Sequence, residues 1–477
     1  NFIINTTNND DNQIFNHLPK GPSFIHWFSN YLLNYYQLKS SKNTATTSFI
    51  DIGSQETVLK WFDQYKSNSY TVLFFGRPMI FTKDIEVSKY VLSNQNIDSF
   101  TKPPDESGVM IKLAKNSILI SEGDNWRHHR SIISPPFSSI NIKSMVPSIL
   151  LKVDQFLNFI KKNNHGSLDI HSCSTKLTFD IIGLLSMGYD FNSFNSENDK
   201  GSISSKQFDF ILNEMIRPIR RFSRFIKLPS DFKLFKYLKQ LDQIISNAIS
   251  SRKLILNNNI EDGIEYKKNY LLDYLIQNNI DEKEIIGNIN TFLLAGHETS
   301  ANLLTFIFYL LSIHKDIQDS IYNEIKNIEN IDSIPPVIEW VINETLRLFP
   351  PAPMIGRSST KQDILPNGIK IPKDTLILVS VYALQRDSKI WKDPNNFNPY
   401  RWRECKNVEE FIPFSSGARI CVGQKFALLE AKIIIFKLLK QFKLEYDEKP
   451  NYPFTIYQRA TLTPKYPVNL LFSSRKQ

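Results

Sequence analysis

The stretch FSSGARICVGQKFALLE near the end of the chain places one cysteine in a loop of small residues that runs into an apolar segment. A cysteine that binds a metal must be a thiolate, and a free thiol loses its proton only at a pH of about 8.5, so the sulfur needs positive charge and N–H donors around it. Gly417 and Gly423 allow unusual backbone conformations and would let the main chain approach a flat bound group, and Arg419 adds a cation. The helix expected after Cys421 turns its positive end toward the sulfur, and Phe414 would shield the loop from water. The pattern predicts a metal-binding thiolate, whereas a cysteine beside a single glycine would indicate only a buried structural thiol.

A second stretch, residues 284–314, is apolar nearly all round and predicts a long helix through the core. In its middle, Gly296 costs about 1 kcal/mol relative to alanine. The acid Glu298 costs more unless it is paired or hydrated. Thr299 follows it, and its hydroxyl could simply bond back to its own helix. Penalties at this depth favour a functional explanation, an acid and a hydroxyl that together handle protons.

Two pairs of residues at helical spacing could bind or orient anionic groups. Trp126 and Arg130 lie four apart and share one face of the helix expected there. Glu344 and Arg347 lie three apart and can form an ion pair, which in a protein interior sets geometry more than it adds stability. Arginine suits carboxylates because its planar fork makes two parallel hydrogen bonds. Taken alone, each pair could also be a surface arginine or a chance helical pair.

These residues carry a resemblance to a known family. The haem-binding signature of the cytochrome P450 family, Phe-x-x-Gly-x-Arg-x-Cys-x-Gly, is matched at Phe414, Gly417, Arg419, Cys421 and Gly423. The resemblance implies haem b (iron protoporphyrin IX) as cofactor, with Cys421 as the axial thiolate ligand of the iron. Such ligation pushes electron density toward oxygen and favours O–O cleavage.

The central helix resembles the same family in its Ala/Gly-Gly-x-Asp/Glu-Thr motif, matched from Ala295 to Thr299. In the family this helix opens into a groove beside the haem, so Ala295 would contact the cofactor. The resemblance implies that Thr299 is a hydrogen-bonding relay and Glu298 a proton source or gate during activation of dioxygen.

Further matches lie between these two motifs. Trp126 and Arg130 correspond to the family's Trp-x-x-x-Arg pair, and Arg357 to an arginine at the end of a Pro-rich segment; both arginines would bind haem propionates. The family's Glu-x-x-Arg pair has a third member, here Arg401. The acid that usually precedes that arginine is Tyr400 in this chain, a departure from the common pattern.

Composition and patterning agree with the fold that the resemblance implies. Of 477 residues 42% are hydrophobic, and Phe (34) and Tyr (19) outnumber Gly (16), which argues against a turn-rich all-β protein. We expect a mainly α protein with small β-sheets, the cytochrome P450 fold, in which a long central helix crosses a buried haem. Strands are expected in a hairpin at 70–82, in two strands within 368–384, and in a closing hairpin at 461–473. Residues 1–23 are interpreted as an N-terminal remnant with a Pro/Gly hinge, and 24–477 as one catalytic domain.

Charge and cysteine content suggest where such a protein works. The three cysteines include no Cys-x-x-Cys pair, so a disulfide framework is not expected and the chain is interpreted as facing the cytosol. The net charge of +9 suits an acidic redox partner or an anionic membrane, or reflects a lysine-rich proteome. No apolar run is long enough to cross a bilayer, and the segment 18–23 resembles the stiff linker that follows the anchor of microsomal members. Arg, Ile and Phe alternate in 217–227, which indicates either a membrane-facing surface or a solvated helix.

The sequence therefore predicts a haem-thiolate monooxygenase of microsomal type that inserts one atom of O2 into an apolar lipid, sterol or xenobiotic. Its expected partners are NADPH-cytochrome P450 reductase, with cytochrome b5 as a second candidate donor, and the endoplasmic reticulum membrane, with the catalytic domain on the cytosolic side. Nucleic acid is not an expected partner, because no reader module is recognisable. One alternative is a haem-thiolate isomerase or dehydratase of peroxides, which needs no reductase and can dispense with the Glu298–Thr299 pair. The other is a haem-free helical lipid-binding protein.

Overall fold

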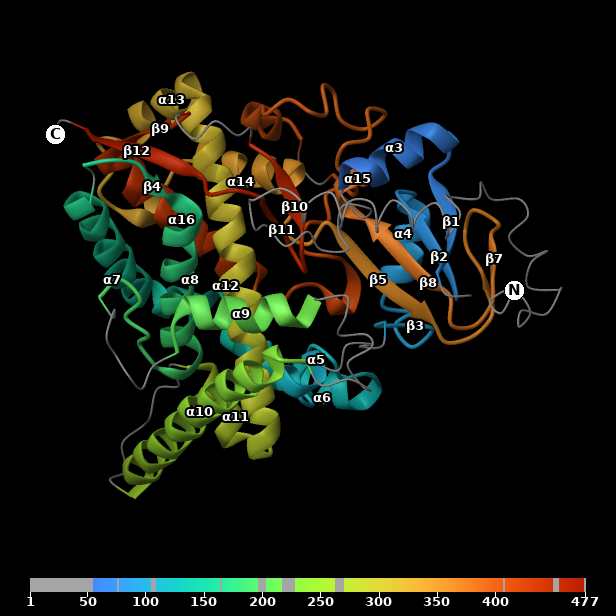
Figure 1. Ribbon diagram of the computed structural model, residues 1–477, viewed down its shortest axis with the longest axis horizontal. Helices are drawn as coiled ribbons and strands as arrows, with labels where there is room; N and C mark the ends of the chain where they lie inside the picture. The colour runs from blue at the N-terminus through green and yellow to red at the C-terminus, as the bar shows by residue number, and fades with distance from the viewer. Residues whose placement is uncertain are drawn as a thin grey trace.

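The computed structural model shows a mainly helical chain with small sheets, as the sequence predicts (Figure 1). It describes residues 55–74, 77–103, 109–163, 165–195, 203–216, 228–261, 270–405, 408–448 and 454–475. The α-helices among them are α3 (Gln55–Tyr65), α4 (Ile85–Leu92), α5 (Val109–Ala114), α6 (Gly123–Ile133), α7 (Ser139–Asn163), α8 (Ile170–Met187), α9 (Ser205–Ile216), α10 (Ser230–Glu261), α11 (Leu271–Gln277), α12 (Glu282–Ile313), α13 (Lys315–Ile325), α14 (Pro336–Leu348), α15 (Val381–Leu384) and α16 (Gln424–Gln441).

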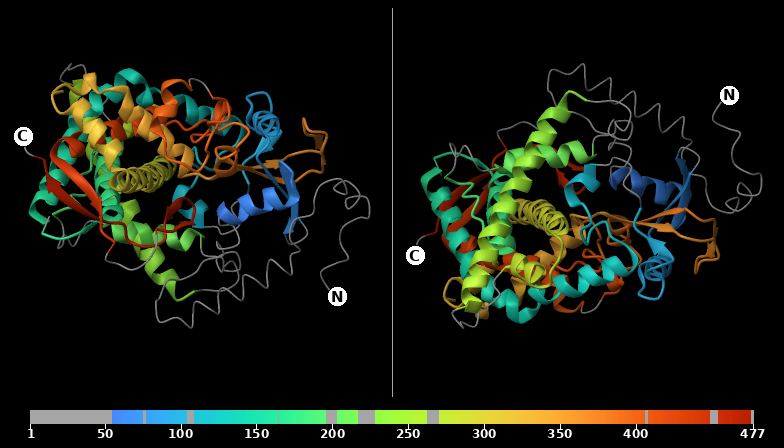
Figure 2. Two further views of the ribbon diagram at one scale, coloured as in Figure 1. Left: turned by 90° about the horizontal axis from the view of Figure 1, so that it is seen from above. Right: turned by 90° about the horizontal axis from the view of Figure 1, so that it is seen from below.

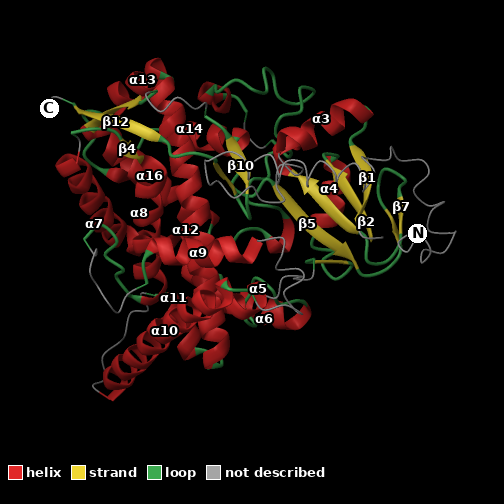
Figure 3. Ribbon diagram, viewed as in Figure 1, coloured by secondary structure: helices red, strands yellow, loops and turns green. Residues whose placement is uncertain are grey.

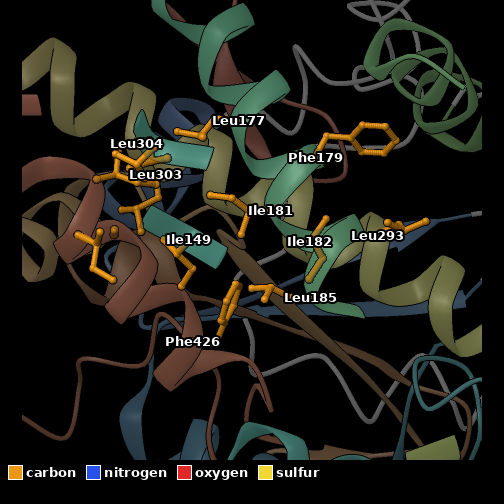
Figure 4. Packing of buried hydrophobic residues seen from close by; sticks show 14 of the residues in the cluster. Ile149, Leu177, Phe179, Ile181, Ile182, Leu185, Leu293, Leu303, Leu304 and Phe426 are labelled. Atoms are coloured by element: carbon orange, nitrogen blue, oxygen red, sulfur yellow. The ribbon is translucent and has the colours of Figure 1, made fainter. Parts of the chain in front are cut away.

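Helix α12 is the long helix expected at 284–314, and it runs through the middle of the molecule (Figure 2). It begins where the Asp281 side chain accepts a hydrogen bond from the Lys283 N–H, with two acids in its first turn. Most of its residues are buried on all sides, which explains why its sequence lacks a polar face. Its tightest partner is α8, and leucines and isoleucines of the two helices interlock with Ile149 and Phe426 (Figure 4).

The strands lie mainly to one side of the helical body (Figure 3). The largest sheet has the order β1-β2-β8-β5-β3, and its strands are β1 (Ser69–Phe74), β2 (Arg77–Thr82), β8 (Leu376–Ser380), β5 (Met354–Ser359) and β3 (Phe100–Thr101). The antiparallel pairing of β1 with β2 confirms the hairpin expected at 70–82. The two strands expected within 368–384 are β7 (Lys370–Ile371) and β8. Strand β5 carries Arg357, which lies opposite Ile377 of β8.

The prediction of a closing hairpin at 461–473 is wrong. This segment contains two strands, β11 (Leu462–Pro464) and β12 (Asn469–Ser474), but they belong to different sheets. Strand β11 pairs with β10 (Ile456–Gln458), whereas β12 pairs with β9 (Phe442–Tyr446) and β4 (Leu168–Asp169). The connection leaves the first sheet after Pro464, and Val468 is already bonded to the Asp169 side chain. The strand partner is therefore chosen by tertiary packing rather than by proximity in sequence.

The structure tests one of the expectations about membranes and does not reach the others. No helix within the described ranges is long and apolar enough to cross a bilayer. Residues 1–23, the interpreted remnant and hinge, and residues 217–227, the interpreted membrane-facing segment, lie outside the part of the chain that the structure describes.

Candidate active site around Cys421

The cysteine loop turns back on itself just before α16. The Cys421 N–H donates to the Phe414 carbonyl oxygen at 2.9 Å, which closes the loop, and the half-buried Phe414 packs against the main core. Gly417 adopts φ +70°, and a Cβ there would lie 1.9 Å from the Leu92 carbonyl oxygen. Both its conformation and its contact exclude any other residue. Glycine is therefore required at 417 because the loop passes close to the chain's own α4. The sequence had suggested instead that this glycine lets the loop approach a ligand.

The sulfur of Cys421 lies at the start of α16, as predicted. Burial raises the pKa of the thiol, while the N–H groups of Gly423 and Gln424 and the cation of Arg130 oppose that rise. Gly423 has an ordinary φ of −83°, so the prediction that it needs special backbone freedom is wrong. Its Cβ position would instead be 3.9 Å from the Cys421 sulfur, so glycine keeps the space beside the sulfur open.

Two parts of the candidate site are accessible although protein surrounds them. Cys421 is dehydrated enough for its pKa to rise, yet its side chain is exposed. Ala295 is exposed in the middle of α12, whereas the four residues before it are buried. The loop and the central helix thus each leave one residue accessible among buried neighbours, as residues that contact a large bound group must be.

Cations crowd the wall of this site. The charged groups that act on Lys102 are three guanidinium groups and one carboxylate, namely Arg419, Glu122, Arg357 and Arg130. Burial and the neighbouring Arg419 lower the pKa of Lys102 to about 7, and the same two causes lower that of Arg357 to about 10. Four cations thus face one carboxylate. Burying like charges together is unfavourable, so this arrangement fits a ligand that brings negative charge.

The cation that acts on the sulfur is Arg130 rather than Arg419, the residue that the sequence suggested. The Arg419 guanidinium pairs with Glu122 and lies 4.4 Å from the centre of the Trp126 ring, while its Nε has no hydrogen-bond partner among the described residues. The Arg130 Nη1 donates to the Ile420 carbonyl oxygen at 2.9 Å, which fixes α6 beside the loop.

The structure thus brings Trp126, Arg130, Arg357 and Arg419 to one wall, as the resemblance implies. A flat macrocycle with two carboxylates fits this donor set: a free sulfur, an open wall beside it, and surplus cations at the edge. The residues present therefore fit haem b.

On α12 the Thr299 hydroxyl donates to the Ala295 carbonyl oxygen, the back-bond that the simpler interpretation of this threonine requires. That bond uses the proton of the hydroxyl and leaves its oxygen able to accept. The Thr178 hydroxyl of α8 donates to the His297 carbonyl oxygen at 3.0 Å. A Cβ on Gly296 would lie 2.8 Å from Ile182, so this glycine permits close packing of α12 on α8.

Glu298 lies on the face of α12 next to the β10–β11 hairpin. Burial raises the pKa of its carboxyl group, while a hydrogen bond from Thr461 and the charge of Arg459 lower it. The carboxyl group can therefore hold a proton closer to neutral pH than an exposed glutamate.

The three-membered ion network predicted at Glu344 is confirmed. Arg347 donates to both Glu344 oxygens at 2.8 and 2.9 Å, and Arg401 donates to one of them at 3.0 Å. The Trp402 indole N–H also donates to Glu344 at 3.0 Å, a contact that no spacing in the sequence predicts. Tyr400 touches neither arginine; its hydroxyl donates to Ser320 on α13 at 3.1 Å.

Sequence reasoning missed Lys102 and Glu122. Lys102 follows a two-residue strand, and its ammonium donates to the Ile118 and Leu119 carbonyl oxygens. Glu122 accepts from the Lys102 backbone N–H at 3.0 Å as well as from Arg419. No spacing or motif marks either residue, because their partners come from segments far apart in the chain.

Comparison with known proteins agrees with this geometry. The family model for cytochrome P450 matches residues 48–472. The chain is 50% identical to probable cytochrome P450 525A1 of Dictyostelium discoideum, over 96% of this chain and 92% of the relative. It is 29% identical to cytochrome P450 3A9 of Rattus norvegicus, over 87% of both chains, and 27% identical to cytochrome P450 3A7 of Homo sapiens, over 84% of both.

Proposed function

The chain belongs to the cytochrome P450 family of haem b monooxygenases, and from this premise we propose that it oxidises an apolar small molecule with electrons from NADPH-cytochrome P450 reductase. Bound haem would supply the oxidising chemistry, and the protein supplies the thiolate, the pocket and the protons. The observation that carries the assignment of the site is the set of four cations around one carboxylate beside an accessible, dehydrated cysteine.

We assign roles to the chain's own residues on this basis. Cys421 would bind the haem iron through its thiolate, whose sulfur accepts from two backbone N–H groups at the start of α16. Arg130 and Arg357 would bind the propionates, with Lys102 as a further donor. The ring of Trp126 holds Arg419 in place, and Arg419 supplies an additional charge at the same wall.

Proton handling falls to the exposed face of α12. The Thr299 oxygen can accept from a water molecule, because its own proton is committed to Ala295. Burial raises the pKa of the neighbouring Glu298 carboxyl group, which favours its taking up and passing on a proton. This pair favours the monooxygenase over the isomerase of peroxides, which has no need of delivered protons.

The test uses the reconstituted protein, the reductase and NADPH. Thr299→Ala should lower product formed per NADPH several-fold while NADPH consumption continues, because the water that accepts and donates at this position is lost. Thr291→Ala is the matched control, because this threonine of the same helix is buried and bonded to Ser117. Unchanged coupling in Thr299→Ala would remove the relay role. The isomerase would be favoured if the protein converted a fatty-acid hydroperoxide without the reductase but formed no oxidised product when the reductase and NADPH were supplied.

The electron donor would dock beside the cysteine loop. Lys425 is exposed four residues after Cys421 and donates to Ser139 at 3.1 Å, so the starts of α16 and α7 form one surface. Lys143 is exposed on the same part of α7, and Ile140 projects there with 82% of its side chain exposed. An apolar contact ringed by lysines suits an acidic protein partner.

We also propose that the protein associates with the cytosolic surface of the endoplasmic reticulum membrane. Support comes from α10 and α5: Phe232 is 82% exposed, Ile111 is 50% exposed, and the Lys112 ammonium lies 4.5 Å from the Phe235 ring. Exposed apolar side chains beside lysines suit an anionic lipid interface.

A further inference from the structure

Helix α9 and the β10–β11 hairpin both lie beside α12 (Figure 1), and residues of both contact it. The Phe208 ring of α9 packs edge-on against His297 of α12, with ring centres 5.5 Å apart. The hairpin is attached to α12 by the Asn302 side chain, which donates to the Thr461 hydroxyl at 2.9 Å. In the turn of that hairpin, the Arg459 N–H donates to the Thr461 carbonyl oxygen at 2.8 Å. These contacts fix three segments around one space.

Three charged residues lie next to these contacts in the sequence. Asp209 comes after Phe208, Glu298 comes after His297, and Arg459 lies in the turn of the hairpin. They act on one another electrostatically, since burial and the Glu298 carboxyl group raise the pKa of Asp209 to about 7 against the opposing charge of Arg459. All three therefore face the same region beside the Glu298–Thr299 face of α12.

The three groups do not neutralise one another by contact. Arg459 donates to the Tyr457 hydroxyl, and Glu298 accepts from Thr461, but no ion pair joins either of them to Asp209 within the described residues. Asp209 itself has no hydrogen-bond partner in that part of the chain. Two carboxyl groups and one guanidinium leave one acidic group over.

A second observation comes from Asn302, which is fully buried. Its Nδ2 is used on Thr461, but its Oδ1 has no hydrogen-bond partner among the described residues. A buried acceptor without a donor is costly, so this position is completed by a group that donates. Among the described residues, the cluster thus has one more carboxyl group than cations and a buried acceptor without a donor.

We propose that Asp209 is a specificity-determining residue that binds a protonated amine on the substrate, at the end remote from the carbon that is oxidised. This inference rests on the proposed monooxygenase function and narrows its substrate to apolar molecules with one basic nitrogen. A carboxylate at this position would meet Arg459 but would face two acids. An alcohol would satisfy Asn302 but would leave the surplus acid without a counterion.

The test measures binding to the purified holoenzyme by calorimetry, with decyltrimethylammonium, decanol and decanoate below their micelle concentrations as probes. The three probes share one chain length, and the quaternary ammonium cannot bind iron through nitrogen. We expect the ammonium probe to bind at least about tenfold more tightly than decanoate, because a factor of ten needs only one favourable contact between partly buried charges. Asp209→Asn should remove that preference, while Asp316→Asn, an exposed acid on α13, should leave it intact.

Each outcome decides the matter. Loss of the ammonium preference in Asp209→Asn alone supports the proposal, and tighter binding of the ammonium probe by Arg459→Gln would support it further. Equal ammonium affinity in wild type and Asp209→Asn, or a wild-type preference for decanoate, overturns it. The carbon monoxide spectrum of the same samples reports the thiolate-ligated haem separately, so failure of the amine proposal is distinguishable from failure of the proposed function.

Discussion

Two buried clusters of charge flank the cysteine loop, and they differ in how their charges are balanced. At the carboxyl end of α14, Glu344 is fully buried and meets Arg347, Arg401 and the Trp402 indole, each at 2.8–3.0 Å. The remaining Arg347 N–H groups donate to backbone carbonyl oxygens. Within this cluster every group has a partner from the chain itself.

At the wall beside Cys421 the buried cations outnumber the carboxylates. Glu122 acts on Lys102, Arg357 and Arg419, the more distant Asp98 acts on Arg419 as well, and burial lowers the pKa of these three cations and of Arg130. A completed network fixes the geometry of a scaffold, whereas an incomplete one marks the place where a ligand supplies what is missing. The comparison therefore separates residues that hold the fold from residues that hold the cofactor.

The largest effect is expected at the balanced cluster. Glu344→Gln should lower the free energy of unfolding by about 3–5 kcal/mol, because two buried arginines lose their counterion. Chemical denaturation of the purified protein measures this, and Glu324→Gln, an exposed acid on α13, is the control. A loss below about 0.5 kcal/mol, typical of a surface site, would show that the network is not what holds this region.

At the cation cluster beside Cys421, a substitution should change haem binding without lowering the stability of the protein. Arg357→Leu is expected to leave the stability of the haem-depleted protein unchanged or improved, because it removes an unpaired buried charge. The same change should speed haem transfer to a haem-free acceptor protein by about tenfold, the equivalent of one charge-assisted hydrogen bond. Arg403→Leu, at an exposed arginine, should alter neither quantity. Loss of stability without faster haem transfer would contradict the distinction between the clusters.

Removing haem should also expose a pH dependence that belongs to Lys102. Its pKa is lowered to about 7 in the folded chain, while an unfolded lysine titrates at about 10.4. The unfolded state therefore binds more protons between these values, so the haem-depleted protein gains stability as the pH rises from about 7 to 10. Thermal unfolding of wild type and Lys102→Met over this range measures the gain, which should be absent in the variant. An identical pH profile for the two would refute the assignment.

The smallest effect is expected at Tyr400, the position where the chain departs from the common pattern. Its side chain is 41% exposed, its hydroxyl donates to Ser320, and its ring lies edge-on to Trp340 with ring centres 6.5 Å apart. Tyr400→Phe should change the free energy of unfolding by less than about 0.5 kcal/mol, as substitutions at surface sites usually do. A loss as large as that of Glu344→Gln would place Tyr400 inside the balanced network.

The sequence predicted those parts of the site that depend on local spacing. Glu344 and Arg347 are three residues apart on one helix, and α12 is recognisable from its continuous apolar run, so both follow from helical geometry. The loop at Cys421 was predicted because its residues are contiguous.

What the sequence could not show depends on segments that meet only in the fold. Glu122 joins the cation cluster through its ion pair with Arg419, about three hundred positions away, and Lys102 lies close enough for the charge of Arg419 to lower its pKa. The role of Gly417 was misjudged because its close neighbour, the Leu92 carbonyl oxygen, belongs to α4. The prediction that Arg419 supplies the cation beside the sulfur failed for the same reason. Arg419 pairs with Glu122 and lies over the Trp126 ring, two partners that come from another part of the chain.

The spectrum of the reduced protein with carbon monoxide tests the central claim most directly. Thiolate ligation by Cys421 predicts a strongly red-shifted band in wild type and in Cys405→Ser, and its loss in Cys421→Ser. A red-shifted band that survives in Cys421→Ser, or wild-type protein that binds no haem, would contradict the account.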